Sequence, residues 1–195
     1  MKHILVINSS LNLESSHSTL LANQLAHHLS EKYQASINSQ DLSTHDLPHL
    51  TQFEMNAWMT DPSERTSEQQ ALCEISDTYI GQIKRADTIV IGMPMYNFGV
   101  PSTFKAWVDR IARAGITFQY TPEGPKGLLQ NKKVIVVAAR GGMYQGTPKD
   151  TQTSYLKDFF GFIGLTDVDF IYAEGLAMSD KETSIAAAQA KIQQY

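Results

Sequence analysis

The sequence predicts an α/β protein in which one parallel sheet carries helices on both faces. Three short segments, at 3–7, 88–93 and 133–139, are apolar and rich in β-branched residues, with no polar alternation. That composition is typical of strands buried on both faces. Segments of helical periodicity separate them, which favours a parallel sheet with right-handed crossovers. The 195 residues predict one domain over 1–195 with a sizeable core.

The first half of the chain supplies two strands and two helices. After the strand at 3–7, leucines at four-residue spacing follow Ser18 and predict the first helix: Leu21, Leu25 and Leu29. The segment 35–42 alternates and is interpreted as an edge strand. "TSEQ" at 66–69 is a capping-box pattern. It precedes the apolar residues of the second predicted helix: Leu72, Ile75, Tyr79, Ile80 and Ile83.

The second half repeats this alternation. The strand at 88–93 is followed, after Pro101, by an apolar helical stripe that consists of Phe104, Trp107, Val108, Ile111 and Ala112. The strand at 133–139 precedes another stripe, which ends at Gly164 and consists of Leu156, Phe159, Phe160 and Ile163. We expect a last strand at 167–175 and a last helix at about 180–193.

The connection at 43–65 is long for a compact domain, and its large apolar residues include Phe53, Met55, Trp58 and Met59. Long connections are commonly functional or locally ordered. The alternative to a functional loop is a short surface helix with a small apolar core of its own. His45 and His49 have an HxxxH spacing, but Pro48 argues against a helix that would align them, so no metal site is predicted.

Composition excludes several classes of protein. A net charge of −4, with 42% hydrophobic and 18% charged residues, indicates a globular chain without a basic nucleic-acid footprint. Cys73 is the single cysteine, which fits a reducing compartment. We interpret Cys73 as a buried structural residue rather than a catalytic thiol. No apolar run approaches the roughly 20 residues that span a membrane, and "KHILVI" is too short for a signal-peptide core. We therefore expect a cytoplasmic protein.

Ligands of open α/β sheets bind beyond the carboxyl ends of the strands, where three loops are expected to meet. The first, "NSSLNLESSHST" at 8–19, holds more hydroxyls than an N-cap needs and leads into a helix near Ser16. Helix N-termini attract phosphate through their unpaired N–H groups. No GxGxxG or Walker A pattern occurs, which argues against a Rossmann dinucleotide site or a P-loop.

The other two loops are less ordinary than simple connections. "MPMYNFGVP" at 93–101 would provide a ligand with flat, apolar and amide-rich surroundings. "AARGGMYQGTP" at 138–148 contains Gly141 and Gly142, which permit close backbone approach. Their amides could donate to a carbonyl-rich ring edge and Arg140 could add charge, whereas the alternative is a plain glycine turn.

Four motifs together resemble the FMN-dependent NADH:azoreductases, also called FMN-dependent NADH:quinone oxidoreductases: "PMYNF", "ARAGITFQYTPEGPKGL", "RGGMY" and "FFGFIGLTDV". The similarity runs from "ILVINSS" to the last helix. It implies a single flavodoxin-like FMN-binding domain over 1–195. The corresponding fold is a five-stranded parallel sheet of order 2-1-3-4-5 with helices on both faces. The resemblance also implies a homodimer with one FMN per subunit.

Carried over residue by residue, the resemblance implies three sets of cofactor contacts. The phosphate would lie on Ser10, Ser16, His17 and Ser18. The isoalloxazine ring would lie against Met95, Tyr96, Asn97 and Phe98. The second ring-edge loop would be Ala139, Arg140, Gly141 and Gly142. The family has glutamine or a similar residue where His17 stands and serine where Ala139 stands, which matters little if backbone amides do the binding.

The resemblance implies an enzyme without a catalytic side chain, because the flavin does the chemistry. NADH or NADPH would deliver a hydride to flavin N5, and two electrons would pass to a quinone or to the azo bond of an aromatic compound. An expected substrate pocket, walled partly by the partner subunit, would include Phe118, Tyr120 and Phe162. Both substrates must use the one open face of the ring, so ping-pong kinetics are expected.

Two rival functions remain open at this point. A flavodoxin-type electron carrier would bind FMN without a substrate pocket of its own. Such carriers are commonly shorter and strongly acidic, so the charge of −4 and the bulky connection at 43–65 count against one. The other rival is an FMN-binding regulatory or scaffold protein, and steady-state NADH oxidation with a quinone would separate the enzyme from both.

Overall fold

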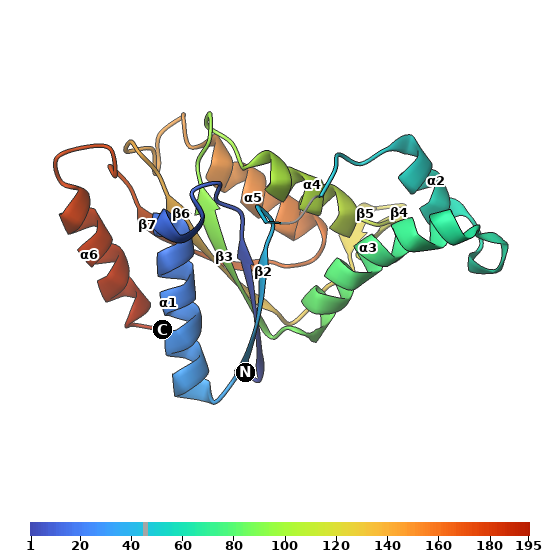
Figure 1. The fold of residues 1–195 in the computed structure, drawn as a ribbon, viewed down its shortest axis with the longest axis horizontal. Helices are drawn as coiled ribbons and strands as arrows, with labels where there is room; N and C mark the ends of the chain where they lie inside the picture. The colour runs from blue at the N-terminus through green and yellow to red at the C-terminus, as the bar shows by residue number, and fades with distance from the viewer. Residues whose placement is uncertain (45–46) are drawn as a thin grey trace.

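A five-stranded parallel sheet forms the centre of the molecule (Figure 1). The structure is a computed structural model that describes residues 1–44 and 47–195. The sheet has the order β2-β1-β3-β6-β7. Its strands are β1 (His3–Asn8), β2 (Ser36–Asp41), β3 (Thr88–Pro94), β6 (Lys133–Ala139) and β7 (Asp167–Ala173). Because β4 (Phe118–Thr121) and β5 (Gly124–Gly127) form a separate sheet, this is the expected order 2-1-3-4-5, with β6 and β7 as the fourth and fifth strands. The prediction of the fold is confirmed.

The central strands are buried along nearly their whole length, whereas the edge strand is not. Every residue of β3 is buried, as are the last five of β1 and the last six of β6. β2 has no fully buried residue and lies at the sheet edge, as its alternating sequence predicts. Strands covered on both faces need continuous apolar sequence, whereas an edge strand tolerates alternation.

Helices cover both faces of the sheet (Figure 1). One face packs on α1 (His17–Tyr33) and α6 (Lys181–Ile192), and the other on α3 (Ser67–Arg85), α4 (Ser102–Ile111) and α5 (Thr151–Phe162). The capping box on α3 forms as predicted, with Thr66 and Gln69 exchanging side-chain and backbone hydrogen bonds. Cys73 is fully buried in α3 and unpaired, which fits its interpretation as structural.

A small antiparallel hairpin is the element that sequence reasoning missed. It consists of β4 (Phe118–Thr121) and β5 (Gly124–Gly127). Its packing on the C-terminal end of α5 is very close: a Cβ built on Gly127 would lie 2.1 Å from the backbone nitrogen of Gly164. Strands of four residues with two glycines and a proline give almost no periodic signal, so tertiary packing decides this hairpin.

The 43–65 connection contains a short helix, α2 (Gln52–Met59), and a 3₁₀ turn, η2 (Pro62–Glu64), and another 3₁₀ turn, η1 (Leu13–Ser15), follows β1. The surface-helix alternative is therefore confirmed, but an apolar core of its own does not hold it. Phe53, Met55 and Met59 are exposed. Instead, buried Glu54 pairs with buried Arg110 of α4 at 2.8 Å, and Arg110 also donates to the Pro48 carbonyl at 2.7 Å.

Candidate functional site

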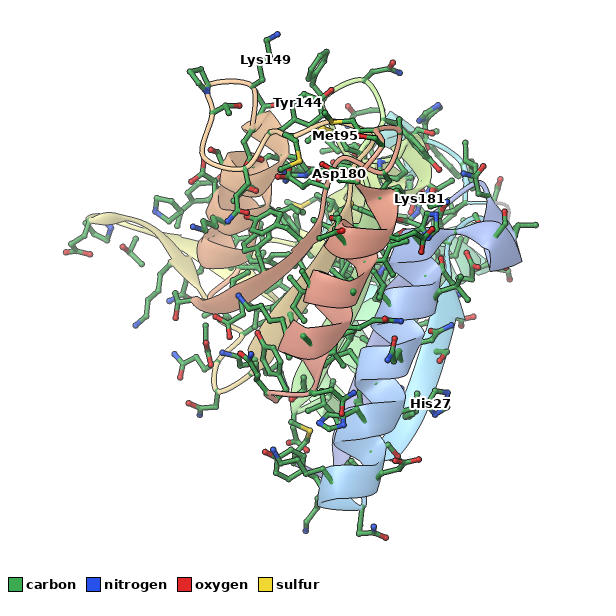
Figure 2. All side chains as sticks on the ribbon, turned by 90° about the vertical axis from the view of Figure 1, so that its left-hand side faces the viewer. His27, Met95, Tyr144, Lys149, Asp180 and Lys181 are labelled. Atoms are coloured by element: carbon green, nitrogen blue, oxygen red, sulfur yellow. The ribbon has the colours of Figure 1, made fainter. Side chains whose placement is uncertain are left out.

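A pocket of about 230 Å³ lies where the carboxyl ends of the strands meet. Most of the predicted cofactor residues line it: Ser10, Ser16, His17, Ser18, Met95, Tyr96, Ala139, Arg140 and Gly141. Asn97, Phe98 and Gly142 belong to the same loops but not to the lining. Figure 2 shows Met95 and Tyr144 at the end of the molecule where α6 begins, at Asp180 and Lys181, whereas His27 lies farther along α1. The three predicted loops therefore converge.

The N-terminus of α1 forms one wall of the pocket. Ser16 is the N-cap, and its hydroxyl accepts from the Thr19 amide at 3.3 Å and contacts the Ser18 hydroxyl at 2.9 Å. The first amides of a helix have no intrahelical acceptor, which leaves the N–H groups of His17 and Ser18 available to an anion. Gly92 allows this close arrangement, because a Cβ there would lie 3.0 Å from the Ser18 carbonyl oxygen.

A tight turn at 95–99 forms the second wall. Tyr96 and Gly99 exchange backbone hydrogen bonds at 3.2 and 2.9 Å around Asn97 and Phe98, whose φ angles are 50° and 64°. Two consecutive residues with positive φ are typical of a type I′ turn, and an aromatic residue in that region carries strain. The Tyr96 hydroxyl contacts the Ser10 hydroxyl at 3.2 Å, so this turn is tied to the first loop.

Arg140, in the third loop, differs from its expected role. Its side chain is buried, with ion pairs to Asp150 at 2.8 Å and Glu174 at 3.0 Å, and it stacks on Tyr172. Burial raises the pKa of Asp150, but hydrogen bonds from Arg140 and Thr153 outweigh it and hold that pKa below its usual value. The positive charge of Arg140 is therefore directed inward, to carboxylates, rather than toward a ligand.

The glycines after Arg140 present backbone instead. In the described part of the chain, the N–H groups of Gly141 and Gly142 meet no acceptor. Leu176 and Ala177, from the loop after β7, also line the pocket, and the Ala177 amide donates to the Gly141 carbonyl at 3.0 Å. Sequence reasoning missed this fourth loop, although its place after the last strand of the sheet was the available signal.

The three residues expected in the substrate pocket form a cluster elsewhere. Phe118 lies 4.3 Å from Phe162 and 5.5 Å from Tyr120, measured between ring centroids. None of the three lines the carboxyl-edge pocket. Phe118 is buried, whereas Tyr120 is 76% exposed. A single chain therefore keeps these aromatic side chains apart from the predicted cofactor residues.

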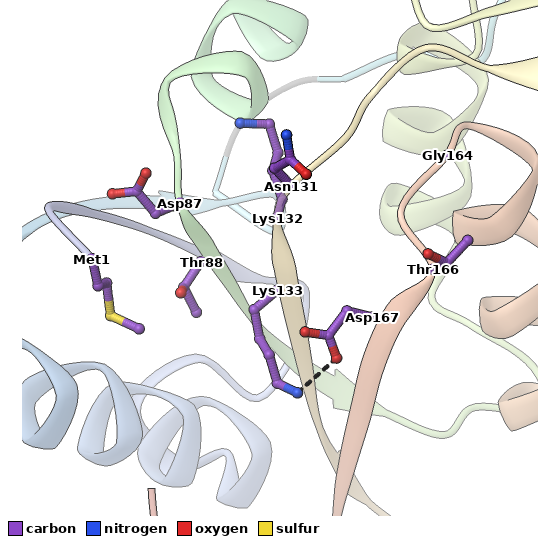
Figure 3. Close-up of a pocket in the computed structure, with 9 residues that line it drawn as sticks. All are labelled: Met1, Asp87, Thr88, Asn131, Lys132, Lys133, Gly164, Thr166 and Asp167. Carbon is purple, nitrogen blue, oxygen red and sulfur yellow. Dashed lines mark hydrogen bonds and ion pairs between the residues drawn. The ribbon is translucent and has the colours of Figure 1, made fainter.

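Another pocket, of about 520 Å³, lies at the amino ends of the strands (Figure 3). Its lysines are engaged: Lys132 donates to the carbonyls of Lys84 and Ala86, and Lys133 pairs with Asp167 and Asp169. This end of the sheet is the less common place for a ligand.

The described residues contain neither a cluster of metal ligands nor a membrane-spanning helix. Within the described residues, no three potential metal ligands of the types His, Cys, Asp and Glu gather. His45, of the HxxxH spacing, lies outside those residues. Among the helices of 1–44 and 47–195, none is long and apolar enough to cross a bilayer.

Three comparisons with known proteins agree with this architecture. A family model described as having the flavodoxin-like fold matches residues 2–195. The FMN-dependent NADH:quinone oxidoreductase of Alteromonas mediterranea is 53% identical over 190 residues, covering 97% of this chain and 95% of the relative. The one from Cellvibrio japonicus is 47% identical over 195 residues, covering 100% of this chain and 98% of the relative.

Solved structures give the same picture. An FMN-dependent NADH-azoreductase from Bacillus anthracis in complex with FMN superposes with a TM-score of 0.89 at 28% identity, covering 100% of this chain and 97% of that one. Another azoreductase structure from Bacillus anthracis gives 0.90 at 27% identity, covering 100% and 98%. The chain therefore belongs to the flavodoxin-like family that includes the FMN-dependent NADH:quinone oxidoreductases.

Proposed function

We propose that this chain is an FMN-dependent NAD(P)H oxidoreductase that reduces quinones by two electrons and reductively cleaves aromatic azo compounds. The observation that carries the proposal is the pocket at the carboxyl edge, where a hydroxyl-rich helix N-terminus and two amide-rich loops meet. The names of relatives about half identical over nearly the whole chain support it.

The residues around the pocket fit the chemical parts of FMN. A phosphate would accept from the free amides of His17 and Ser18 and from the hydroxyls of Ser16 and Ser18, at the positive end of the α1 dipole. The first turn of α1 contains no acidic residue, so the anion meets no repulsion from that turn. Ser10, whose hydroxyl contacts Tyr96, would join the phosphate site to the ring site.

The ring would be oriented by backbone as much as by side chains. Met95, Tyr96 and Phe98 offer apolar surface to its flat faces, and the amides of Gly141 and Gly142 offer donors to its polar edge. When bound, FMN supplies two-electron hydride chemistry between a nicotinamide and an acceptor. The protein's own contribution is to hold that ring with one face open and to exclude water from the other.

We also propose that the enzyme works as a homodimer. The exposed Tyr120 and the exposed Phe98 lie on different parts of one chain, and a partner subunit would bring the aromatic cluster of one chain to the flavin of the other. Sedimentation at micromolar concentration is expected to give a dimer. A monomer at all concentrations would contradict this part of the proposal.

Steady-state kinetics test the proposed activity. NADH and a quinone must both come within about 3–3.5 Å of the same open ring face, so oxidised nicotinamide leaves before the acceptor binds. Double-reciprocal plots at several fixed quinone concentrations should be parallel. Intersecting lines, with a ternary complex confirmed by product inhibition, would contradict the shared face. An absence of NADH oxidation in the presence of FMN and quinones would favour an electron carrier or a regulatory FMN protein.

Azo reduction is tested with the same assay and a different acceptor. Each cycle delivers two electrons, so full cleavage of one azo bond to two amines takes two cycles and two NADH. The expected stoichiometry is therefore two NADH oxidised for each dye molecule bleached. A protein that reduces quinones but leaves azo dyes intact would limit the proposal to quinones.

A further inference from the structure

Side chains from the first turn of α5 donate hydrogen bonds to the backbone of the 95–99 turn and of Pro94 before it. Thr151 Oγ1 donates to the Phe98 carbonyl oxygen at 2.5 Å. The side-chain nitrogen of Gln152 donates to the carbonyl oxygens of Pro94 and Gly99, each at 2.9 Å. Gln152 is only 1% exposed. One helix end therefore binds the backbone on both sides of the turn.

Gln152 also connects this turn to Arg140. Its carbonyl oxygen accepts from Arg140 Nε at 3.3 Å, and Arg140 Nη1 donates to Glu174 Oε1 at 3.0 Å. That carboxylate oxygen accepts from the backbone N–H groups of Tyr144 and Gln145, both at 3.0 Å. A buried hydrogen-bond chain thus runs from one loop of the pocket to the other, through three side chains that none of the predictions from sequence had linked.

The partners of Gln152 determine how its amide is oriented. The nitrogen faces two carbonyl oxygens and the oxygen faces a guanidinium N–H, so a flipped amide would place donor against donor and acceptor against acceptor. Carboxylate and thioether side chains of similar length cannot make all three bonds. The position therefore requires a group that donates twice and accepts once.

The turn held by Gln152 is also the strained one. Asn97 and Phe98 both have positive φ, and such conformations persist only where the surroundings fix them. Outside the network, two contacts link the loops: the Met95 amide donates to the Ala139 carbonyl oxygen at 3.1 Å, next to the last β3–β6 pair, and Phe98 meets Tyr144 edge-on, with centroids 5.6 Å apart. The first joins only the ends of the two strands and the second is partly exposed, so the buried chain is the constraint that reaches the residues beyond them.

We propose that Gln152 is a positioning residue for the flavin site: through Pro94, Gly99 and Arg140 it fixes the two ring-contacting loops in one relative arrangement. The identity of the ligand in this statement rests on the proposed function, whereas the coupling of the loops does not. Gln152 is buried and does not line the pocket. Its effect on FMN affinity is therefore transmitted through the loops that it binds.

Amide hydrogen exchange on the full chain, before and after removal of bound FMN, tests the coupling directly. Gln152→Met is expected to raise exchange at Tyr96 and Gly99, and also at Tyr144 and Gln145, by at least about tenfold, equivalent to about 1.4 kcal/mol. Thr151→Val, at an exposed residue bonded only to the Phe98 carbonyl, should raise exchange in the 95–99 turn alone. The control is Gln130→Met, at an exposed glutamine outside the network, which should change neither loop.

Two results would overturn the proposal. One is wild-type exchange at Tyr144 and Gln145 in Gln152→Met; the other is an equal rise throughout the sheet, which would indicate general destabilisation. If Gln152→Met does not fold, Gln152→Glu replaces it. That variant keeps an acceptor for Arg140 but loses at least one donated bond, so it must raise exchange at Tyr96 and Gly99. Unchanged exchange there would also overturn the proposal.

FMN supplies a second readout. In Gln152→Met the dissociation constant of FMN, measured by quenching of its fluorescence, should rise about tenfold or more, and the reduction potential of bound FMN should shift. Neither should change in Gln130→Met. An FMN affinity within twofold of wild type would refute the positioning role. If the wild-type chain binds no FMN, the proposed function fails, and the exchange comparison alone decides whether Gln152 couples the loops.

Discussion

The carboxyl edge of the sheet and the β4–β5 hairpin contain the two groups of residues that the sequence associates with function, and they differ in how completely one chain builds them. At the carboxyl edge, Tyr96 ties the first loop to the second, and Gln152 with Arg140 ties the second to the third. The hairpin instead presents Tyr120 to solvent. We propose from this difference that one chain suffices to bind the cofactor, whereas a second chain completes the proposed acceptor pocket.

The hairpin should be most sensitive to substitution where it packs on the end of α5. Gly127→Ala would place a Cβ 2.1 Å from the Gly164 nitrogen and 2.3 Å from its Cα, and both are backbone atoms that cannot turn away. We expect a loss of about 3 kcal/mol in the free energy of unfolding, measured in urea.

The matched control is Gly161→Ala, in α5 of the same region. A Cβ there meets nothing within 4 Å, and replacing a helical glycine by alanine should raise stability by about 0.5–1 kcal/mol. If both substitutions cost the same, the close approach of the hairpin to α5 would be wrong.

At the carboxyl edge, the proposed phosphate site can be tested by substituting Ser16. Ser16→Ala removes a hydroxyl from the proposed phosphate site, and a hydrogen bond to a charged group contributes about 1.5–3 kcal/mol. The dissociation constant of FMN should rise about 10- to 150-fold. Loss of the N-cap itself should also lower stability by about 1 kcal/mol.

Thr66→Ala separates these two consequences. Thr66 caps α3, far from the pocket lining, so this substitution should lower stability by a similar amount while FMN affinity stays the same. An unchanged FMN affinity in Ser16→Ala would mean that backbone amides alone hold the phosphate.

The ion pair of Asp150 with Arg140, in the third loop, should make the free energy of unfolding depend on pH. The pKa of Asp150 is lowered in the folded state, so its ionised form contributes stability above its unfolded pKa of about 3.9, and this is lost as pH falls through the folded value. Asp150→Asn should cost about 1–2 kcal/mol at pH 7, since Glu174 keeps its own pair with Arg140. The difference from wild type should shrink below about pH 4, and a constant difference from pH 7 to pH 3 would contradict the assignment.

Tyr120 in the hairpin should matter to the acceptor but hardly to stability. Tyr120→Ala should change the free energy of unfolding by less than about 0.5 kcal/mol, because the side chain is largely exposed. FMN affinity should also stay the same. The KM for a quinone should rise if a partner subunit's hairpin walls the acceptor pocket, and an unchanged KM would remove Tyr120 from that pocket.

Much of the fold followed from local patterns. Continuous apolar runs identified β1, β3 and β6, and the capping box at Thr66 marked the start of α3 within one residue. The β4–β5 hairpin escaped because it is stabilised by packing of Gly127 on Gly164, which are far apart in sequence. The start of α5 also escaped, since Thr151, Gln152 and Thr153 are polar and give no apolar stripe.

The site was predictable to the level of loops and not to the level of side chains. Hydroxyls before a helix and glycines after a strand indicated where a ligand would lie. The inward direction of Arg140 depends on Glu174 and Asp150, which the sequence does not place near it. A buried arginine and a ligand-binding arginine look the same in sequence, because only tertiary structure brings their carboxylates together.

Whether one chain binds the cofactor can be measured by titrating the purified chain with FMN, followed by absorbance and by thermal unfolding. We expect a yellow protein that saturates at one FMN per chain and whose thermal midpoint rises with added FMN, as ligands that bind only the folded state require. The same titration of Ser16→Ala should saturate at higher FMN concentration. A colourless protein whose spectrum and thermal midpoint do not respond to FMN would mean that the pocket at the carboxyl edge does not bind FMN.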